Sequence, residues 1–137
     1  MPKTPVLLIL ALAVCAPALR AQATFRPDSL LLARKATIWF YTARFDSLIA
    51  HHDSAARADS TLSSRYTQQL MFLTERAGTE TEVLEEKFVR RNGQPQYWRT
   101  ARFTDFAEPL LIRWVIVAGE IAGMGMGPLS QAPPIDP

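Results

Sequence analysis

The amino-acid sequence predicts an α+β domain in which about three N-terminal helices pack on a curved antiparallel sheet of three to four strands. Two observations support this fold class. Apolar residues recur every three or four positions before Gly78, which is typical of helices, and every second position after it, which is typical of strands. Helices followed by strands indicate an α+β fold with the helices on one face of the sheet.

The first 23 residues are predicted to be a signal peptide. Lys3 supplies a positive charge, residues 6–18 are apolar and uncharged, and Ala21 and Ala23 are small residues at the positions that signal peptidase reads. The apolar stretch is shorter than the about 20 residues of a membrane-spanning helix, so no permanent span is expected. We therefore expect a secreted or periplasmic protein, cleaved after Ala23 or alternatively after Ala21.

Cys15 is the single cysteine of the chain. Residues 12–15 resemble the box that precedes the lipid-modified cysteine of bacterial lipoproteins, but Val14 stands where such boxes have Gly, Ala or Ser. We therefore expect Cys15 to be lost with the signal peptide and not to carry a lipid. The thiol-free remainder excludes disulfides, cysteine-rich zinc sites and cysteine nucleophiles.

Cleavage also changes the charge of the protein. The full chain has 15 Lys and Arg against 13 Asp and Glu, and Lys3 and Arg20 leave with the signal peptide. The mature chain is then neutral. A neutral domain lacks the basic surface of a nucleic-acid-binding protein, so we predict no nucleic-acid partner.

Three helices are predicted in the first half of the mature chain. The first covers residues 29–43, after the capping residues Asp28 and Ser29, and the second covers residues 45–51. Residues 53–59 are small and polar and are predicted to form a loop. The third helix covers residues 60–77 and ends at Gly78.

Four strands are predicted in the second half. Their ranges are 82–91, 97–106, 110–118 and 121–126. Asn92 and Gly93 predict a tight hairpin, because both residues tolerate positive φ. The third strand is apolar on both faces except for Arg113, so we place it in the centre of the sheet. Alternating glycines suit the last strand to a packed or edge position, and the Pro-rich residues 129–137 are predicted to form a disordered tail.

This order resembles the nuclear transport factor 2-like superfamily, also described as ketosteroid isomerase-like or cystatin-like cone proteins, and its small secreted bacterial members in particular. The resemblance covers roughly residues 29–128. It rests on Ala36, Trp39 and Phe40, on the segment 45–48, on Gly93 with Tyr97 and Trp98, and on the ending 114–128. It implies a cone-shaped pocket between the sheet and the long helices. Enzymes of the superfamily place acids, Tyr or His in that cone, whereas other members are binding or dimerisation modules.

Asp105 and Tyr97 are the candidate catalytic residues. Within the predicted strand 97–106 their side chains share one face with Arg99, because strand side chains alternate. On a pocket-lining face, an apolar setting would raise the pKa of Asp105 and suit it to act as a base. Tyr97 could then donate a hydrogen bond to an oxyanion. The alternative is that Asp105 pairs with Arg99 or belongs to a turn.

Four residues are candidates for ligand binding. They are Tyr97, Trp98, Arg113 and Trp114. Arg113 interrupts an apolar strand, so it either binds an anion in a pocket or pairs with a carboxylate of Glu85, Glu86 or Asp105. The alternative for the tryptophans is packing in the core.

His51 and His52 form the one histidine cluster of the sequence. Adjacent side chains on a helix point about 100° apart, so the two rings cannot readily serve one ion. We expect a solvated helix end and predict no metal and no cofactor. The sequence therefore favours a non-catalytic domain that binds a small apolar ligand or a protein partner, and that forms a homodimer through its sheet. The alternative is an isomerase-type or hydrolase-type enzyme with Asp105 as its base.

Overall fold

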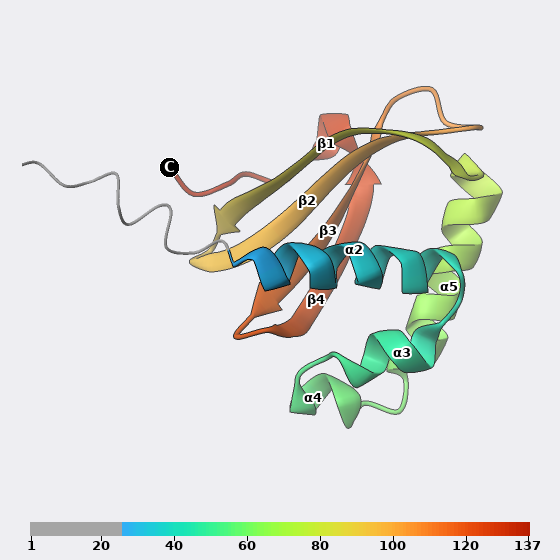
Figure 1. The fold of residues 1–137 in the computed structure, drawn as a ribbon. Helices are drawn as coiled ribbons and strands as arrows, with labels where there is room; N and C mark the ends of the chain where they lie inside the picture. Colours follow the sequence, from blue (N-terminus) through green and yellow to red (C-terminus); the bar gives the residue numbers. More distant parts are fainter. Residues whose placement is uncertain (1–25) are drawn as a thin grey trace, which may run out of the picture.

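The computed structural model describes residues 26–137 (Figure 1). The predicted signal peptide, with its cleavage positions and Cys15, lies outside the described residues. Helices precede a four-stranded antiparallel sheet, which confirms the predicted α+β class. No helix within residues 26–137 is long and apolar enough to cross a membrane.

Between residues 26 and 79 the structure contains two long and two short helices. They are α2 (Pro27–Tyr41), α3 (Phe45–Ala50), α4 (Ser54–Arg57) and α5 (Leu62–Ala77). The prediction of a loop over residues 53–59 is wrong at α4. There the Asp53 carboxylate accepts a hydrogen bond of 2.9 Å from the Ala56 amide and so caps a single helical turn.

The sheet is a meander in which each strand pairs with its neighbours in the sequence. Its strands are β1 (Glu80–Arg91), β2 (Gln94–Phe103), β3 (Leu110–Val117) and β4 (Glu120–Pro128), in the order β1-β2-β3-β4. Asn92 and Gly93 join β1 to β2 with φ of 52° and 74°, as the hairpin prediction requires. β3 pairs with β2 on one side and with β4 on the other, which confirms its internal position.

The core lies between the helices and one face of the sheet, which we call the inner face. Figure 1 shows α2 crossing this face, while α5 stands at one end of the sheet. β3 contributes Leu110, Ile112, Trp114 and Ile116 to the core. The Trp114 indole donates a 3.0 Å hydrogen bond to the Thr37 hydroxyl and thereby links the middle of α2 to the centre of the sheet.

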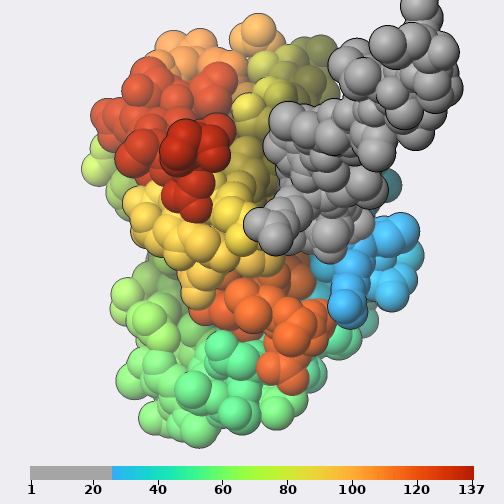
Figure 2. Space-filling view, turned by 90° about the vertical axis from the view of Figure 1, so that its left-hand side faces the viewer, coloured from blue at the N-terminus to red at the C-terminus, as the bar shows by residue number. Residues whose placement is uncertain are grey.

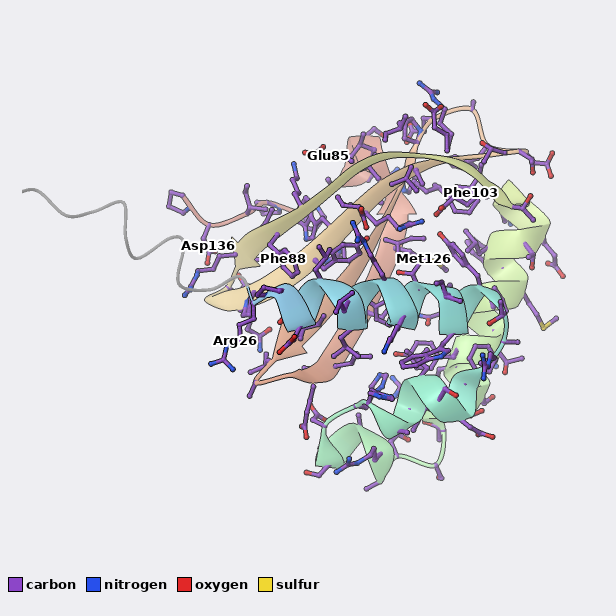
Figure 3. The ribbon with its side chains drawn as sticks, in the orientation of Figure 1. Arg26, Glu85, Phe88, Phe103, Met126 and Asp136 are labelled. Atoms are coloured by element: carbon purple, nitrogen blue, oxygen red, sulfur yellow. The ribbon has the colours of Figure 1, made fainter. Side chains whose placement is uncertain are left out.

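The opposite face of the sheet, the outer face, carries a second and smaller apolar cluster of Val89, Trp98 and Leu111. The glycines of β4 belong to this face, because Gly125 pairs with Arg113 and Gly127 with Leu111. The methionines between them point the other way and pack against the main core, and Figure 3 shows Met126 on that side. The alternation of glycine and methionine therefore leaves the outer face of this part of β4 without side chains and gives its inner face apolar side chains.

The C-terminal residues 129–137, predicted as a disordered tail, have a defined course in the structure. They begin with a short 3-10 helix, η1 (Leu129–Gln131). The Asp136 carboxylate then accepts hydrogen bonds of 2.9 Å from the amides of Asn92 and Gly93. Figures 2 and 3 show the end of the chain against the β1–β2 hairpin. Hydrogen bonds thus hold the tail at the tip of the β1–β2 hairpin.

Candidate functional site

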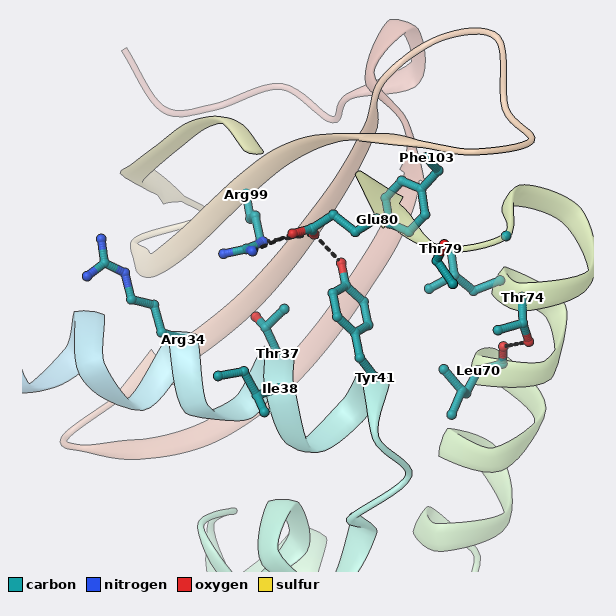
Figure 4. Close-up of a pocket in the computed structure, with 12 residues that line it drawn as sticks. Arg34, Thr37, Ile38, Tyr41, Leu70, Thr74, Thr79, Glu80, Arg99 and Phe103 are labelled. Atoms are coloured by element: carbon teal, nitrogen blue, oxygen red, sulfur yellow. Dashed lines mark hydrogen bonds and ion pairs between the residues drawn. The ribbon is translucent and has the colours of Figure 1, made fainter. Parts of the chain in front are cut away.

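A pocket of about 470 Å³ lies between α2, α5 and the inner face of β1 and β2 (Figure 4). Its apolar lining comes mainly from Ile38, Tyr41, Leu70, Leu73 and Phe103, and its polar lining from Arg34, Thr37, Thr74, Thr79, Glu80 and Arg99. Ile38 is 58% exposed, so the pocket opens to solvent beside α2.

One wall of the pocket is a chain of charged hydrogen bonds centred on Glu80. The Arg99 guanidinium donates to both oxygens of the Glu80 carboxylate, at 2.5 and 3.0 Å. The Tyr41 hydroxyl donates to the same carboxylate at 2.6 Å, and Figure 4 shows both contacts. Burial and the adjacent carboxylate raise the pKa of Tyr41 well above its usual value. The tyrosine therefore stays protonated and serves as a donor.

A second carboxylate, Glu86, extends the chain toward the start of α2. Arg34 donates to its two oxygens at 3.0 and 2.8 Å, and the Tyr97 hydroxyl donates to it at 2.5 Å. Hydrogen bonds from Arg34 and Tyr97 outweigh the effect of burial and lower the pKa of Glu86 to about 2. Burial and the bond to Glu86 raise the pKa of Tyr97 to about 12. Arg99 lies 3.5 Å from both Glu86 and the Tyr97 hydroxyl and joins the two halves.

Two groups of this network, Glu86 and Tyr97, have pKa values far from neutrality. The pKa of Glu86 and that of Tyr97 lie far below and far above neutrality, respectively, whereas a proton-transfer catalyst works best with a pKa near the working pH. Their charged and hydroxyl groups are already engaged with one another. The network therefore links α2 to the sheet and forms a paired, polar wall beside the apolar side of the pocket.

Asp105 lies apart from this network. β2 ends at Phe103, three residues before the predicted end, and Asp105 is an exposed residue of the following turn. The turn is fixed by backbone hydrogen bonds, from the Thr104 amide to Thr79 and from the Asp105 amide to Ala77. The prediction that Asp105 shares a strand face with Tyr97 is wrong, and the structure matches the alternative of a turn residue.

The other candidate residues divide between the two faces of the sheet. Tyr97 and Trp114 are fully buried on the inner face, with Tyr97 bound to Glu86 and Trp114 packed in the core. Trp98 and Arg113 belong to the outer face, where they pair across β2 and β3. None of the carboxylates proposed as partners of Arg113 forms an ion pair with it among the described residues.

The two histidines differ in their surroundings. His51 is exposed and contacts Trp39, with ring centroids 4.6 Å apart and ring planes tilted by 32°. His52 is 2% exposed, so the prediction of a solvated helix end is wrong for this residue. Its Nδ1 donates to the Leu48 carbonyl at 2.9 Å, and its Nε2 accepts from the Tyr66 hydroxyl at 2.7 Å. Within residues 26–137, no group of three or more His, Cys, Asp or Glu side chains is arranged to hold a metal ion.

Sequence reasoning missed the residues that form the polar wall of the pocket. The sequence predicts no role for Arg34, Tyr41 and Glu80, and it predicts Glu86 only as a possible partner of Arg113. The pairing of β1 with β2 shifts register between Glu80 and Glu82 and again between Val83 and Glu85. These irregularities break the period of two that would have shown which glutamates face inward.

Comparisons with protein-family models, with curated proteins and with solved structures find no match for this chain. The resemblance to the nuclear transport factor 2-like superfamily therefore stays a prediction.

Proposed function

We propose that the protein is a non-catalytic binding domain that takes a small apolar molecule into the pocket between α2, α5 and the β1–β2 pair. The observation that supports the proposal is a pocket with a largely apolar lining, in which the charged side chains of one wall pair with each other. Its volume of about 470 Å³ falls in the range of about 300–1,000 Å³ that is usual for small-molecule sites.

The lining supports an apolar ligand over a charged one. Leu70, Leu73, Phe103 and the ring of Tyr41 offer contact to a hydrocarbon or aromatic group. A charged ligand that bound Arg99 or Glu80 in place of its partner would break their ion pair, in which both side chains are largely buried. Removing one partner from a buried ion pair leaves an uncompensated charge and is strongly unfavourable. A neutral ligand that displaces water from the apolar side avoids this cost.

The enzymatic alternative has less support. It requires Asp105 and Tyr97 to converge in one pocket, whereas Asp105 is an exposed turn residue outside the pocket lining and Tyr97 is bound to Glu86. A homodimer through the sheet is a further proposal, which light scattering on the purified protein tests.

The signal peptide would place the binding site in the periplasm or outside the cell, and mature protein isolated from there should begin at Thr24.

The binding test uses the fluorescent apolar probe N-phenyl-1-naphthylamine. We expect a saturable rise in probe fluorescence with the wild-type protein. Ile38→Trp places a larger side chain at the pocket and should weaken binding about tenfold, equivalent to about 1.4 kcal/mol. Leu31→Trp is the matched control, because Leu31 is on the same helix, is 56% exposed and lies outside this pocket.

Two results would contradict the proposal. One is the absence of saturable probe binding to the wild-type protein. The other is an equal loss of affinity in Ile38→Trp and Leu31→Trp, since only the first residue lines the pocket. Circular dichroism of both variants establishes that the fold is retained.

A further inference from the structure

A groove runs between α5 and β4, the last strand of the sheet. It consists of two cavities of about 220 and 230 Å³, lined on β4 by residues 122–124 and residues 126–128, respectively. The α5 residues that line them are Leu62, Arg65, Tyr66, Gln69, Phe72, Leu73 and Arg76. Their spacing of three or four positions places them on one face of the helix. Both elements contribute earlier residues to the first cavity and later residues to the second, so the cavities lie end to end.

β4 is an edge strand, and part of its backbone faces away from the sheet. Hydrogen-bonded and non-bonded pairs alternate along an antiparallel ladder. The pair that closes the two-residue turn between β3 and β4 is hydrogen-bonded, and so is the pair of Val115 with Gly123, two positions further along β3. The ladder is regular from Gly123 to the end of β4. The backbone N–H and C=O groups of Met124 and Met126 therefore point away from β3.

The chain itself already pairs with the start of this edge. The Ile121 amide donates to the His51 carbonyl at 2.8 Å, and the Ile121 carbonyl accepts from the Asp53 amide at 3.0 Å. The pairing stops there, because in the described part of the chain Met124 and Met126 form no backbone hydrogen bond outside the sheet. β4 therefore binds an extended segment at one end and offers the same kind of bonds, unused, along the rest of its edge.

The α5 side of the groove combines an exposed apolar ring with a cation. Phe72 is 57% exposed, and the Arg76 guanidinium lies 5.2 Å from the centre of its ring. Arg76 forms no ion pair among the described residues. Glu75 precedes it on the helix, but none of the described carboxylates lines either cavity. At the other end of the groove Arg65 is already paired with Asp59, at 2.6 Å. Arg76 is therefore the cation of the groove that is open to a partner.

We propose that the groove between α5 and β4 binds an extended acidic peptide, which adds to β4 as a further strand. At a free sheet edge, backbone hydrogen bonds give affinity and side-chain contacts give specificity. The peptide backbone would bond to Met124 and Met126. Its side chains would place an apolar group on Phe72 and a carboxylate beside Arg76. The charge of Arg76 favours this partner over a second copy of the chain, because residues 121–128, which would pair there, have no charged side chain.

The binding probe is the peptide fluorescein-GEVFVEG-amide. Its two glutamates and its phenylalanine share one face of an extended strand, because strand side chains alternate. The sequence reads the same in both directions, so either orientation of the added strand places a glutamate toward Arg76. We expect a saturable rise in fluorescence anisotropy. The same peptide with lysine in place of both glutamates should bind about tenfold or more weakly, because its charge repels Arg76.

Amide hydrogen exchange, measured by NMR on ¹⁵N-labelled protein, locates the bound peptide. In the free protein the amides of Met124 and Met126 should exchange faster than those of Gly123 and Gly125, which bond to β3. At nine-tenths saturation with unlabelled peptide, exchange at Met124 and Met126 should slow about tenfold, because it then comes from the free fraction of the protein. Exchange at the two glycines should change much less.

Three variants test the α5 side of the groove. Arg76→Glu should weaken binding of the acidic peptide about tenfold or more, because it places like charges together. Arg44→Glu is the matched control, since it makes the same change at an exposed arginine that lines neither cavity. Phe72→Ala removes the apolar contact and should also weaken binding. Circular dichroism shows whether each variant is folded, and Phe72→Ala decides the question if Arg76→Glu is not.

Three results would overturn the proposal. The first is that the acidic peptide does not bind saturably, or leaves the exchange of Met124 and Met126 unchanged. The second is an equal affinity for the lysine peptide or an equal loss in Arg44→Glu and Arg76→Glu, which indicates general attraction between charges. The third is slow exchange at both methionines in the free protein that slows further with protein concentration, which indicates that a second copy covers the edge. None of these results bears on the small-molecule pocket, whose lining shares only Leu73 with the groove.

Discussion

Replacement of Thr37 by Val tests how α2 is held on the sheet. Thr37 is 1% exposed, and its hydroxyl makes two hydrogen bonds. It donates to the Ala33 carbonyl at 2.9 Å and accepts from the Trp114 indole at 3.0 Å. Valine has nearly the same shape, so the substitution removes these bonds while leaving little cavity.

The expected loss of stability comes from the indole nitrogen of Trp114. Trp114 is fully buried, and the indole N–H has no other hydrogen-bond partner in the described part of the chain. A buried donor that loses its acceptor costs about 1–3 kcal/mol. The Ala33 carbonyl contributes little to this loss, because it is a backbone acceptor of the helix. We therefore expect Thr37→Val to lower the free energy of unfolding by about 1–3 kcal/mol.

The assay is urea unfolding followed by far-UV circular dichroism, which does not depend on the fluorescence of Trp114. Thr67→Val is the matched control, because the Thr67 hydroxyl also donates to the carbonyl four residues earlier but is exposed and has no buried partner. The control should change stability by less than about 0.5 kcal/mol, as is usual for surface substitutions. Equal effects of the two substitutions would refute the reasoning. Since α2 also lines the pocket, Thr37→Val should weaken probe binding as well.

Two further predictions concern a turn and a buried ring. Gly78 has φ of 79°, and a Cβ there would lie 2.0 Å from the Thr104 hydroxyl, whereas Gly93 has φ of 74° with nothing within 4 Å. Thermal unfolding should therefore show Gly78→Ala to be destabilised well beyond Gly93→Ala, which should lose only the about 1–2 kcal/mol of a left-handed backbone. Burial lowers the pKa of His52, despite the nearby carboxylate of Asp53, so the unfolded chain binds a proton that the folded chain excludes. The free energy of unfolding should then fall as the pH drops below about 6.5, the unperturbed pKa of histidine. Urea unfolding at pH 7.5 and 5.0 measures this fall, and His52→Gln should make it smaller. A fall of the same size in the variant would mean that other groups cause it.

The sequence predicted the elements that depend on local geometry. The change of period at Gly78 marks the boundary between helices and strands, because helix and strand place successive side chains at different angles around the chain. The Asn92-Gly93 hairpin and the internal position of β3 follow from backbone preference and from apolarity on both strand faces. These predictions needed no knowledge of distant residues, and the structure agrees with each of them.

The candidate catalytic site failed where a strand end had to be placed. Thr104 and Asp105 leave the sheet because their amides bond to Thr79 and Ala77 at the junction of α5 and β1. No pattern near Asp105 shows this, since the partner residues are about 25 positions away in the sequence. A shift of three residues was sufficient to move Asp105 from a strand face to an exposed turn.

Which charges face the pocket was decided by tertiary structure alone. In a regular strand Glu82 and Glu86 would share a face, but the shift between Val83 and Glu85 places Glu86 inward beside Arg99 and leaves Glu82 outward beside Arg102. A β-bulge reverses the faces of all residues beyond it, and its position depends on the partner strand. The sequence by itself determined that helices precede a meander and where the hairpin turns. The pairing of β1 with β2 and the packing of α2 decided which side chains meet, because these contacts join residues far apart in the chain.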